Sequence, residues 1–191
     1  MRDVAADRST GGCGMGERAV MQLYYERTVE ELEGLVGRGF AVSGHAFAPV
    51  LFAKGELNAS ERAGGALLGG EDGRALEAAL ERLGYPSDAW AALATEVRPE
   101  GGAWVPAAPE ELSEAVEVFD PELVVALDDP AARALEGAWE LPAPLGSGSV
   151  ARVRGRRVLA LGGFEAALAD PRAKQVMWAR LKQVPPLGAP L

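Results

Sequence analysis

The sequence contains one cysteine and one histidine among its 191 residues. A single cysteine, Cys13, excludes a disulfide framework and every zinc or iron–sulfur site built from cysteines, and it fits a reducing compartment. With a single histidine, any metal centre would have to be built from carboxylates alone. We therefore predict a cytoplasmic protein without a metal or another cofactor.

Long apolar runs and the common catalytic motifs are also missing. No run approaches the roughly 20 apolar residues of a membrane span, and the first residues lead into no signal-peptide core, so we predict no membrane association. The sequence has no phosphate-binding G-x-x-x-x-G-K-[ST], no G-x-G-x-x-G after the first apolar run, no H-E-x-x-H and no G-x-S-x-G. A nucleotide-binding protein that uses its glycine-rich loop is therefore the weakest of the functional hypotheses.

Charge is present, but it is unevenly distributed. The net charge is -9, and the segment Pro109–Glu140 alone holds ten acidic residues against Arg133. The segment Ala151–Leu191 has eight basic residues against two acidic ones. A nucleic acid would meet the local field of this basic segment rather than the average charge. A protein partner could instead bind the acidic 109–140 face, and both segments could equally be ordinary solvated surfaces.

One stretch organises the chain. Phe47–Ala53 is an apolar run of strand length without alternation, which is typical of a buried parallel strand. A polar, glycine-rich loop follows, and then Arg74–Leu83 has apolar residues at helical spacing. A strand, a long glycine-rich loop and a helix form a ligand site in many open α/β sheets. We predict an α/β fold, a three-layer α/β/α sandwich whose central, mainly parallel sheet has about four strands with Phe47–Ala53 in its interior.

The remaining elements alternate in type. We expect residues 1–17 to be a flexible tail and 18–191 to be a single domain. Helices are expected at Thr28–Val36 with Thr28 as the N-cap, Glu110–Phe119, Pro130–Trp139 and Pro171–Val184. Further strands are expected at Trp90–Thr95, Leu123–Leu127, Ser149–Arg154 and Arg156–Leu161, the last two around a tight turn at Gly155.

Three segments together resemble the uracil-DNA glycosylase superfamily, in particular its bacterial and archaeal iron–sulfur branch. Gly55-Glu56-Leu57-Asn58-Ala59 is similar to the family's G-E-x-P-G after a strand. Gly64–Gly69 is similar to its G-x-P-F-V-G loop. Gly163–Lys174, with Trp178 beyond, follows a basic hairpin and is similar to its H-P-S-x-L-x-x-x-P-x-x-K stretch. The resemblance spans roughly Phe47 to Val184.

The resemblance implies roles for particular residues and also departures from the family. Glu56 and Asn58 fall on catalytic positions, where Glu56 would position water or stabilise the cationic sugar and Asn58 could hydrogen-bond a base edge. Leu67, Gly163 and Phe164 fall on the base pocket. Gly163 replaces the histidine that stabilises charge on the base, and Leu67 replaces the aromatic that stacks on it. Losing such an electrostatic donor costs about 10²–10³ in rate. The cluster cysteines are absent, so no iron–sulfur cluster is expected.

Two functional hypotheses follow. In the first, the chain is a uracil-DNA glycosylase-like protein with altered or lost N-glycosidic bond hydrolysis that binds single-stranded or damaged DNA. Asn58 could equally be a turn residue, and Glu56 could cap loop amides. In the second, the same fold is a non-catalytic protein-interaction module. The predicted nucleic-acid contacts include Leu168 as an apolar wedge or a packing residue, with the basic residues Arg152, Arg154, Arg156, Arg172 and Lys174.

Overall fold

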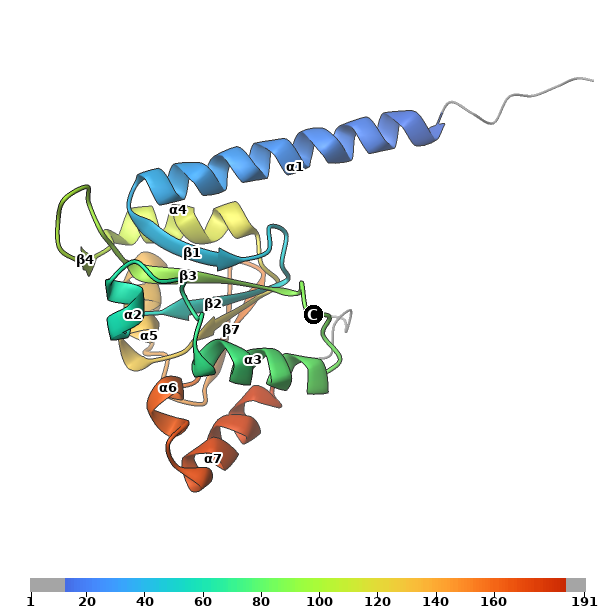
Figure 1. Cartoon of the computed structure of the whole chain (residues 1–191). Helices are drawn as coiled ribbons and strands as arrows, with labels where there is room; N and C mark the ends of the chain where they lie inside the picture. The colour runs from blue at the N-terminus through green and yellow to red at the C-terminus, as the bar shows by residue number, and fades with distance from the viewer. Residues whose placement is uncertain (1–12, 185–191) are drawn as a thin grey trace, which may run out of the picture.

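The computed structural model describes residues 13–184 as a mixed sheet with helices on both faces (Figure 1). The strands are β1 (Phe40–Gly44), β2 (Val50–Lys54), β3 (Trp90–Val97), β4 (Val105–Pro106), β5 (Leu123–Ala126), β6 (Val150–Val153) and β7 (Arg156–Ala160). The helices are α1 (Cys13–Gly37), α2 (Ala59–Arg62), α3 (Glu71–Arg82), α4 (Pro109–Phe119), α5 (Asp129–Ala138), α6 (Phe164–Ala167) and α7 (Pro171–Leu181).

The sheet has the strand order β1-β3-β2-β5-β7-β6, and β4 pairs with β3. Its four inner strands, β3, β2, β5 and β7, are parallel to one another, whereas β1 and β6 are antiparallel to their neighbours. The prediction of a mainly parallel sheet with an interior strand from the run Phe47–Ala53 is confirmed, but the strand begins at Val50, and Phe47 is 51% exposed in the turn before it. The sheet is larger than expected because the antiparallel strands β1, β4 and β6 extend it.

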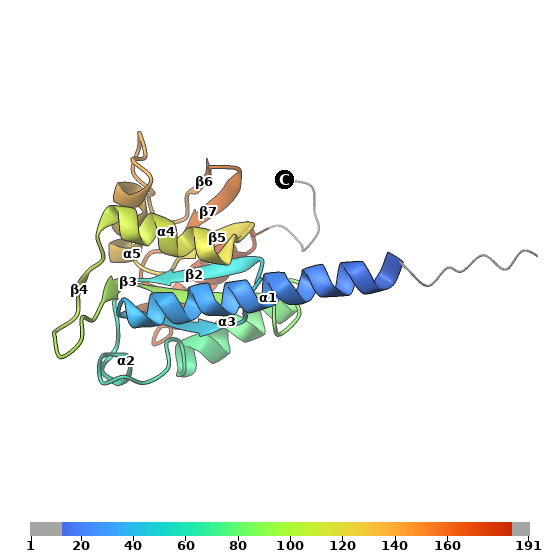
Figure 2. The ribbon, with the colours of Figure 1, turned by 90° about the horizontal axis from the view of Figure 1, so that it is seen from above.

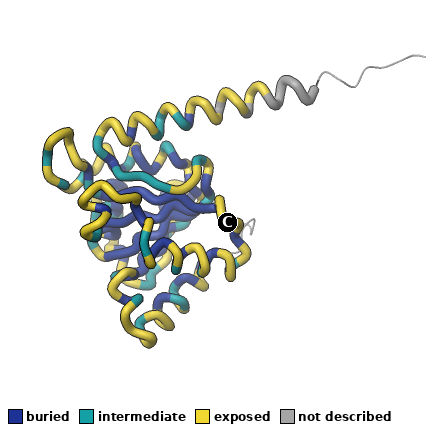
Figure 3. The backbone as a smooth tube through the Cα atoms, in the orientation of Figure 1, coloured by how far each residue is buried: buried dark blue, intermediate teal, exposed yellow. Residues whose placement is uncertain are grey.

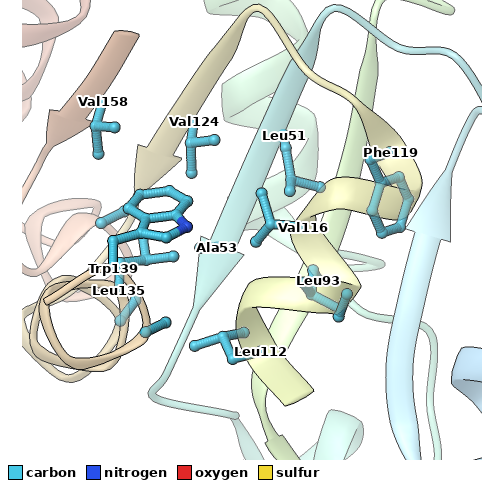
Figure 4. Close-up of a cluster of buried hydrophobic side chains, with 14 of the residues drawn as sticks. Leu51, Ala53, Leu93, Leu112, Val116, Phe119, Val124, Leu135, Trp139 and Val158 are labelled. Atoms are coloured by element: carbon cyan, nitrogen blue, oxygen red, sulfur yellow. The ribbon is translucent and has the colours of Figure 1, made fainter. Parts of the chain in front are cut away.

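Alternating residues of each inner strand contribute to two separate cores. Leu51 and Ala53 of β2 face the core under α1, α4 and α5, while Val50 and Phe52 face the core under α3, α6 and α7. All five residues of β2 are buried, which explains why the first four, Val50–Ala53, are continuously apolar. Figure 2 shows α1 and α4 lying along one face of the sheet, and Figure 4 shows Val116 of α4 beside Leu51, with Leu112 one turn away in the same core. The three-layer sandwich is thus confirmed.

The first helix differs from the prediction. Thr28 does not cap it: α1 begins at Cys13, and Thr28 is buried inside the helix. Part of the expected tail, Cys13–Glu17, is therefore helical, and residues 1–12 lie outside the described part of the chain. The C-terminal half of α1 packs on the sheet through Leu32 and Leu35, whereas its N-terminal half extends past the sandwich (Figure 1). The side chains described in that half, which include Val20 and Leu23, are exposed (Figure 3).

Candidate functional site

The candidate site lies where three parallel strands end. β2 ends at Lys54, β5 is followed by Asp128, and β7 is followed by Gly163. The carboxyl ends of parallel strands meet at one edge of the sheet, so these three positions converge. They line a small cavity together with Glu56, Asp72, Leu127, Phe164 and Glu165.

Lys54 is the central side chain of this site. It is 2% exposed, and its Nζ donates to Asp72 Oδ2 at 2.7 Å, to Glu165 Oε2 at 2.7 Å and to Glu61 Oε1 at 3.0 Å. Glu61 and Asp72 are each 3% exposed, while Glu165 is 46% exposed. One buried cation therefore holds two buried carboxylates and one at the surface. We call these four residues the Lys54 cluster.

The cluster keeps Lys54 protonated. Burial acts to lower the pKa of Lys54, but its hydrogen bonds to Asp72, Glu165 and Glu61 outweigh burial and leave the pKa above its ordinary value. A lysine that acts as a base or a nucleophile needs a lowered pKa. Lys54 is therefore a fixed positive charge in this arrangement rather than a reacting group.

The loop after β2 is fastened by Glu61 and Asn58. Asn58 caps α2, accepting from the Ser60 and Glu61 amides, and Glu61 accepts from the Asn58 amide at 2.8 Å, which completes a capping box. The other oxygen of Glu61 accepts from the Leu68 amide at 2.9 Å. Both residues thus hold the loop in shape, and Asn58 does not line the cavity.

Asp128 fastens the start of the same loop to the next strand. Its carboxylate accepts from the Gly55 amide at 3.0 Å, the Glu56 amide at 2.9 Å and the Ala131 amide at 2.8 Å. The last bond caps α5. A Cβ on Gly55 would lie 2.6 Å from the Ala131 nitrogen, so this approach of loop and helix requires glycine.

Three of the five predicted catalytic and base-pocket residues lie together. Glu56, Gly163 and Phe164 line the cavity at the strand ends. Leu67 is 2% exposed and belongs to the core under α3, α6 and α7. Glu56 is exposed, and its amide rather than its carboxylate contacts Asp128. The cavity measures about 10 Å³, which is room for about one water molecule.

The predicted basic contacts do not share one face. Arg156 is buried, and its guanidinium contacts Glu117 Oε2 at 2.7 Å and Asp120 Oδ1 at 3.4 Å. Arg154 lies in the hairpin turn and contacts Ser113 and Glu117. Both arginines therefore face α4, whereas Lys174 lies on α7 across the sheet. The turn at Gly155, with φ of +84°, is where the hairpin reverses.

The other predicted nucleic-acid contacts are either exposed on the surface or packed against the core. Arg152 and Arg172 are exposed. Leu168 is half-buried and packs on the core under α3, α6 and α7, so it takes the packing role rather than that of a protruding wedge. The acidic 109–140 face is partly neutralised, because Glu114 pairs with Arg38 and Glu117 pairs with the hairpin arginines.

Sequence reasoning missed the Lys54 cluster and Asp128. A lysine at the end of an otherwise apolar, buried run was the available signal, because an unpaired lysine is almost never buried. An aspartate directly before Asp129-Pro130 was a second signal for a cap. Neither pattern identifies Glu61, Asp72 or Glu165 as partners.

No protein-family model matches the chain, and no curated protein matches it either. Between residues 13 and 184, no group of three or more histidine, cysteine, aspartate or glutamate side chains is arranged to hold a metal ion. No helix in that part of the chain is long and apolar enough to cross a bilayer.

Proposed function

We propose that this chain is a divergent uracil-DNA glycosylase-like domain that does not excise bases and acts as a non-catalytic protein-interaction module. The observation that carries the proposal is the Lys54 cluster, which fills the carboxyl end of the sheet and leaves a cavity of about 10 Å³. Pockets that bind small ligands measure roughly 300–1,000 Å³. A nucleobase does not fit in this cavity.

The charges around the cavity also oppose base excision. As an N-glycosidic bond breaks, negative charge develops on the leaving base, and a catalyst places donors or cations there. Here Asp72, Asp128 and Glu165 line the cavity. The one cation, Lys54, already donates to three carboxylates. Gly163 supplies no side chain, so no free donor side chain stands in for the histidine of the related family.

The exposed half of α1 supplies a surface for a protein partner. Val20 and Leu23 are 53% and 66% exposed in the N-terminal half of α1, and Tyr25, at 54% exposure, contacts the ring of Phe47. A helical segment shorter than about 12–15 residues that packs on nothing is marginal in water, and apolar residues on it gain stability when a partner covers them. This surface is a better candidate than the acidic 109–140 face, where Arg38, Arg154 and Arg156 already engage glutamates.

We expect the protein to release no uracil from single- or double-stranded DNA above the rate without protein. The measurement is an incision assay over a panel of damaged bases, with an active glycosylase as the positive control. Glu56→Gln is the matched variant, because it removes the predicted catalytic carboxylate from an exposed position while leaving the Asp128–amide bond intact. Base release by the wild type that falls in Glu56→Gln would contradict the proposal.

We expect Leu23→Lys to lose the partner that the wild-type chain retains in affinity capture, by tenfold or more, because a charge replaces an apolar side chain at an interface. Val150→Lys is the matched control, since Val150 is 45% exposed on β6, outside α1. Quantitative mass spectrometry of the captured proteins gives the ratio. Equal retention by Leu23→Lys and Val150→Lys would show that α1 is not the surface.

A further inference from the structure

A second hollow lies between α3 and α7. Figure 1 shows both helices on the face of the sheet that carries α6. It measures about 270 Å³, far more than the cavity at the strand ends. We call it the α3–α7 groove. Its lining comprises Ala75, Ala78, Ala79 and Arg82 of α3, Phe164 and Ala167 of α6, Leu168, and Lys174, Met177, Trp178 and Leu181 of α7.

The shape of the groove follows from the sequence of the two helices. On α3 the lining positions are spaced i, i+3, i+4 and i+7, so they form one face, and three of the four are alanine. On α7 the lining positions have the same spacing and carry Met177, Trp178 and Leu181. Small side chains on one wall face large apolar ones on the other, which leaves an apolar trough.

Two cations stand beside this apolar trough. Arg82 and Lys174 line the groove, and both are exposed. Within residues 13–184, neither side chain has a hydrogen bond or an ion pair. The acidic residues of α3 nearest in sequence, Glu77 and Glu81, line a different hollow with Tyr85 and Trp90. The carboxylate of Asp170 caps α7. The groove therefore combines an apolar body with unneutralised positive charge.

We propose that the α3–α7 groove binds a small-molecule carboxylate with an unbranched apolar body of about eight carbons. The chain of such a ligand fits between the alanines of α3 and Met177 and Trp178 of α7, and its carboxylate pairs with Arg82 or Lys174. The charge complementarity selects an anion over a neutral or cationic amphiphile. This site is independent of the proposed loss of base excision, because it shares only Phe164 with the cavity at the strand ends.

The test is a chemical-shift titration of the ¹⁵N-labelled full-length chain with sodium octanoate, below its micelle concentration. We expect saturable shifts at α3 and α7, including the indole N–H of Trp178, which Trp178→Phe identifies. Hexanoate should bind more weakly by about fourfold for each methylene removed. 1-Octanol and octylammonium should bind at least fivefold more weakly than octanoate.

Matched variants distinguish binding in this groove from nonspecific hydrophobic binding elsewhere on the protein. Arg82→Gln combined with Lys174→Gln should weaken octanoate binding at least fivefold. Arg74→Gln on α3 combined with Lys182→Gln directly after α7, two exposed cations that do not line the groove, should leave octanoate binding unchanged. Ala78→Leu should weaken octanoate and octanol alike by filling the trough. Equal affinity for octanoate and octanol, unchanged binding in the Arg82/Lys174 variant, or groove shifts that depend on protein concentration without ligand would overturn the proposal.

Discussion

Replacing Lys54 by methionine should lower the free energy of unfolding by about 3–5 kcal/mol, the usual loss when one partner of a buried ion pair is removed. Methionine fills much of the volume of the lysine stem, so the loss is electrostatic rather than a cavity effect. Glu61 and Asp72, each 3% exposed, would remain buried without their cation. Glu165, at 46% exposure, would turn to water and contribute little.

Urea unfolding followed by circular dichroism measures this loss at pH 7 and pH 9. The pKa of Lys54 is raised in the folded state. Its contribution to the free energy of unfolding is therefore fully present below its unfolded pKa of about 10.4, and this contribution is lost only as the pH rises through the folded pKa. The deficit should therefore be the same at both pH values. The combined variant Lys54→Met, Asp72→Asn should recover part of it. Lys174→Met, at an exposed position, should change stability by less than about 0.5 kcal/mol, and an equal loss in both single variants would contradict a buried cluster.

Replacing Asp128 by alanine should lower the free energy of unfolding by about 3 kcal/mol. The substitution removes the N-cap of α5, which costs about 1 kcal/mol by itself. It also leaves the amides of Gly55 and Glu56 without their acceptor. An unsatisfied buried amide costs about 1–3 kcal/mol.

Asp129→Ala is the matched control for this substitution. Asp129 is the neighbouring residue, is exposed, and makes one hydrogen bond of 3.2 Å to the Ser147 hydroxyl. It should change stability by less than about 0.5 kcal/mol in the same urea titration. If Asp128→Ala lowers the free energy of unfolding no more than Asp129→Ala does, the prediction is wrong. The amides of Gly55, Glu56 and Ala131 would then donate to water in the variant.

The parts of the fold that could be predicted depend on local sequence. The continuous apolar run of β2 indicated an interior parallel strand, and Asp170-Pro171 marked the start of α7, where the Asp170 side chain does cap the helix. The hairpin with Gly155 at its turn was also visible. Each of these signals is contained within a few consecutive residues.

What could not be predicted depends on contacts between distant residues. Thr28 is a residue type that often caps helices, but packing on the sheet places it inside a longer helix. Arg154 and Arg156 were predicted as nucleic-acid contacts, yet Glu117 of α4 pairs with both of them. The site shows the same limit, because Glu61, Asp72 and Glu165 have no feature in the sequence that connects them to Lys54.

The Lys54 cluster also bears on the order in which the chain folds. Lys54 and Glu165 are 111 residues apart, so their contact closes a long loop and requires β5 to be already paired with β2, and β7 with β5. We expect the cluster to form after the rate-limiting step of folding. Interactions absent from the transition state act on the unfolding rate and hardly on the folding rate. The charged centre of this protein would then act as a kinetic lock, which lengthens the lifetime of the folded chain without speeding its assembly.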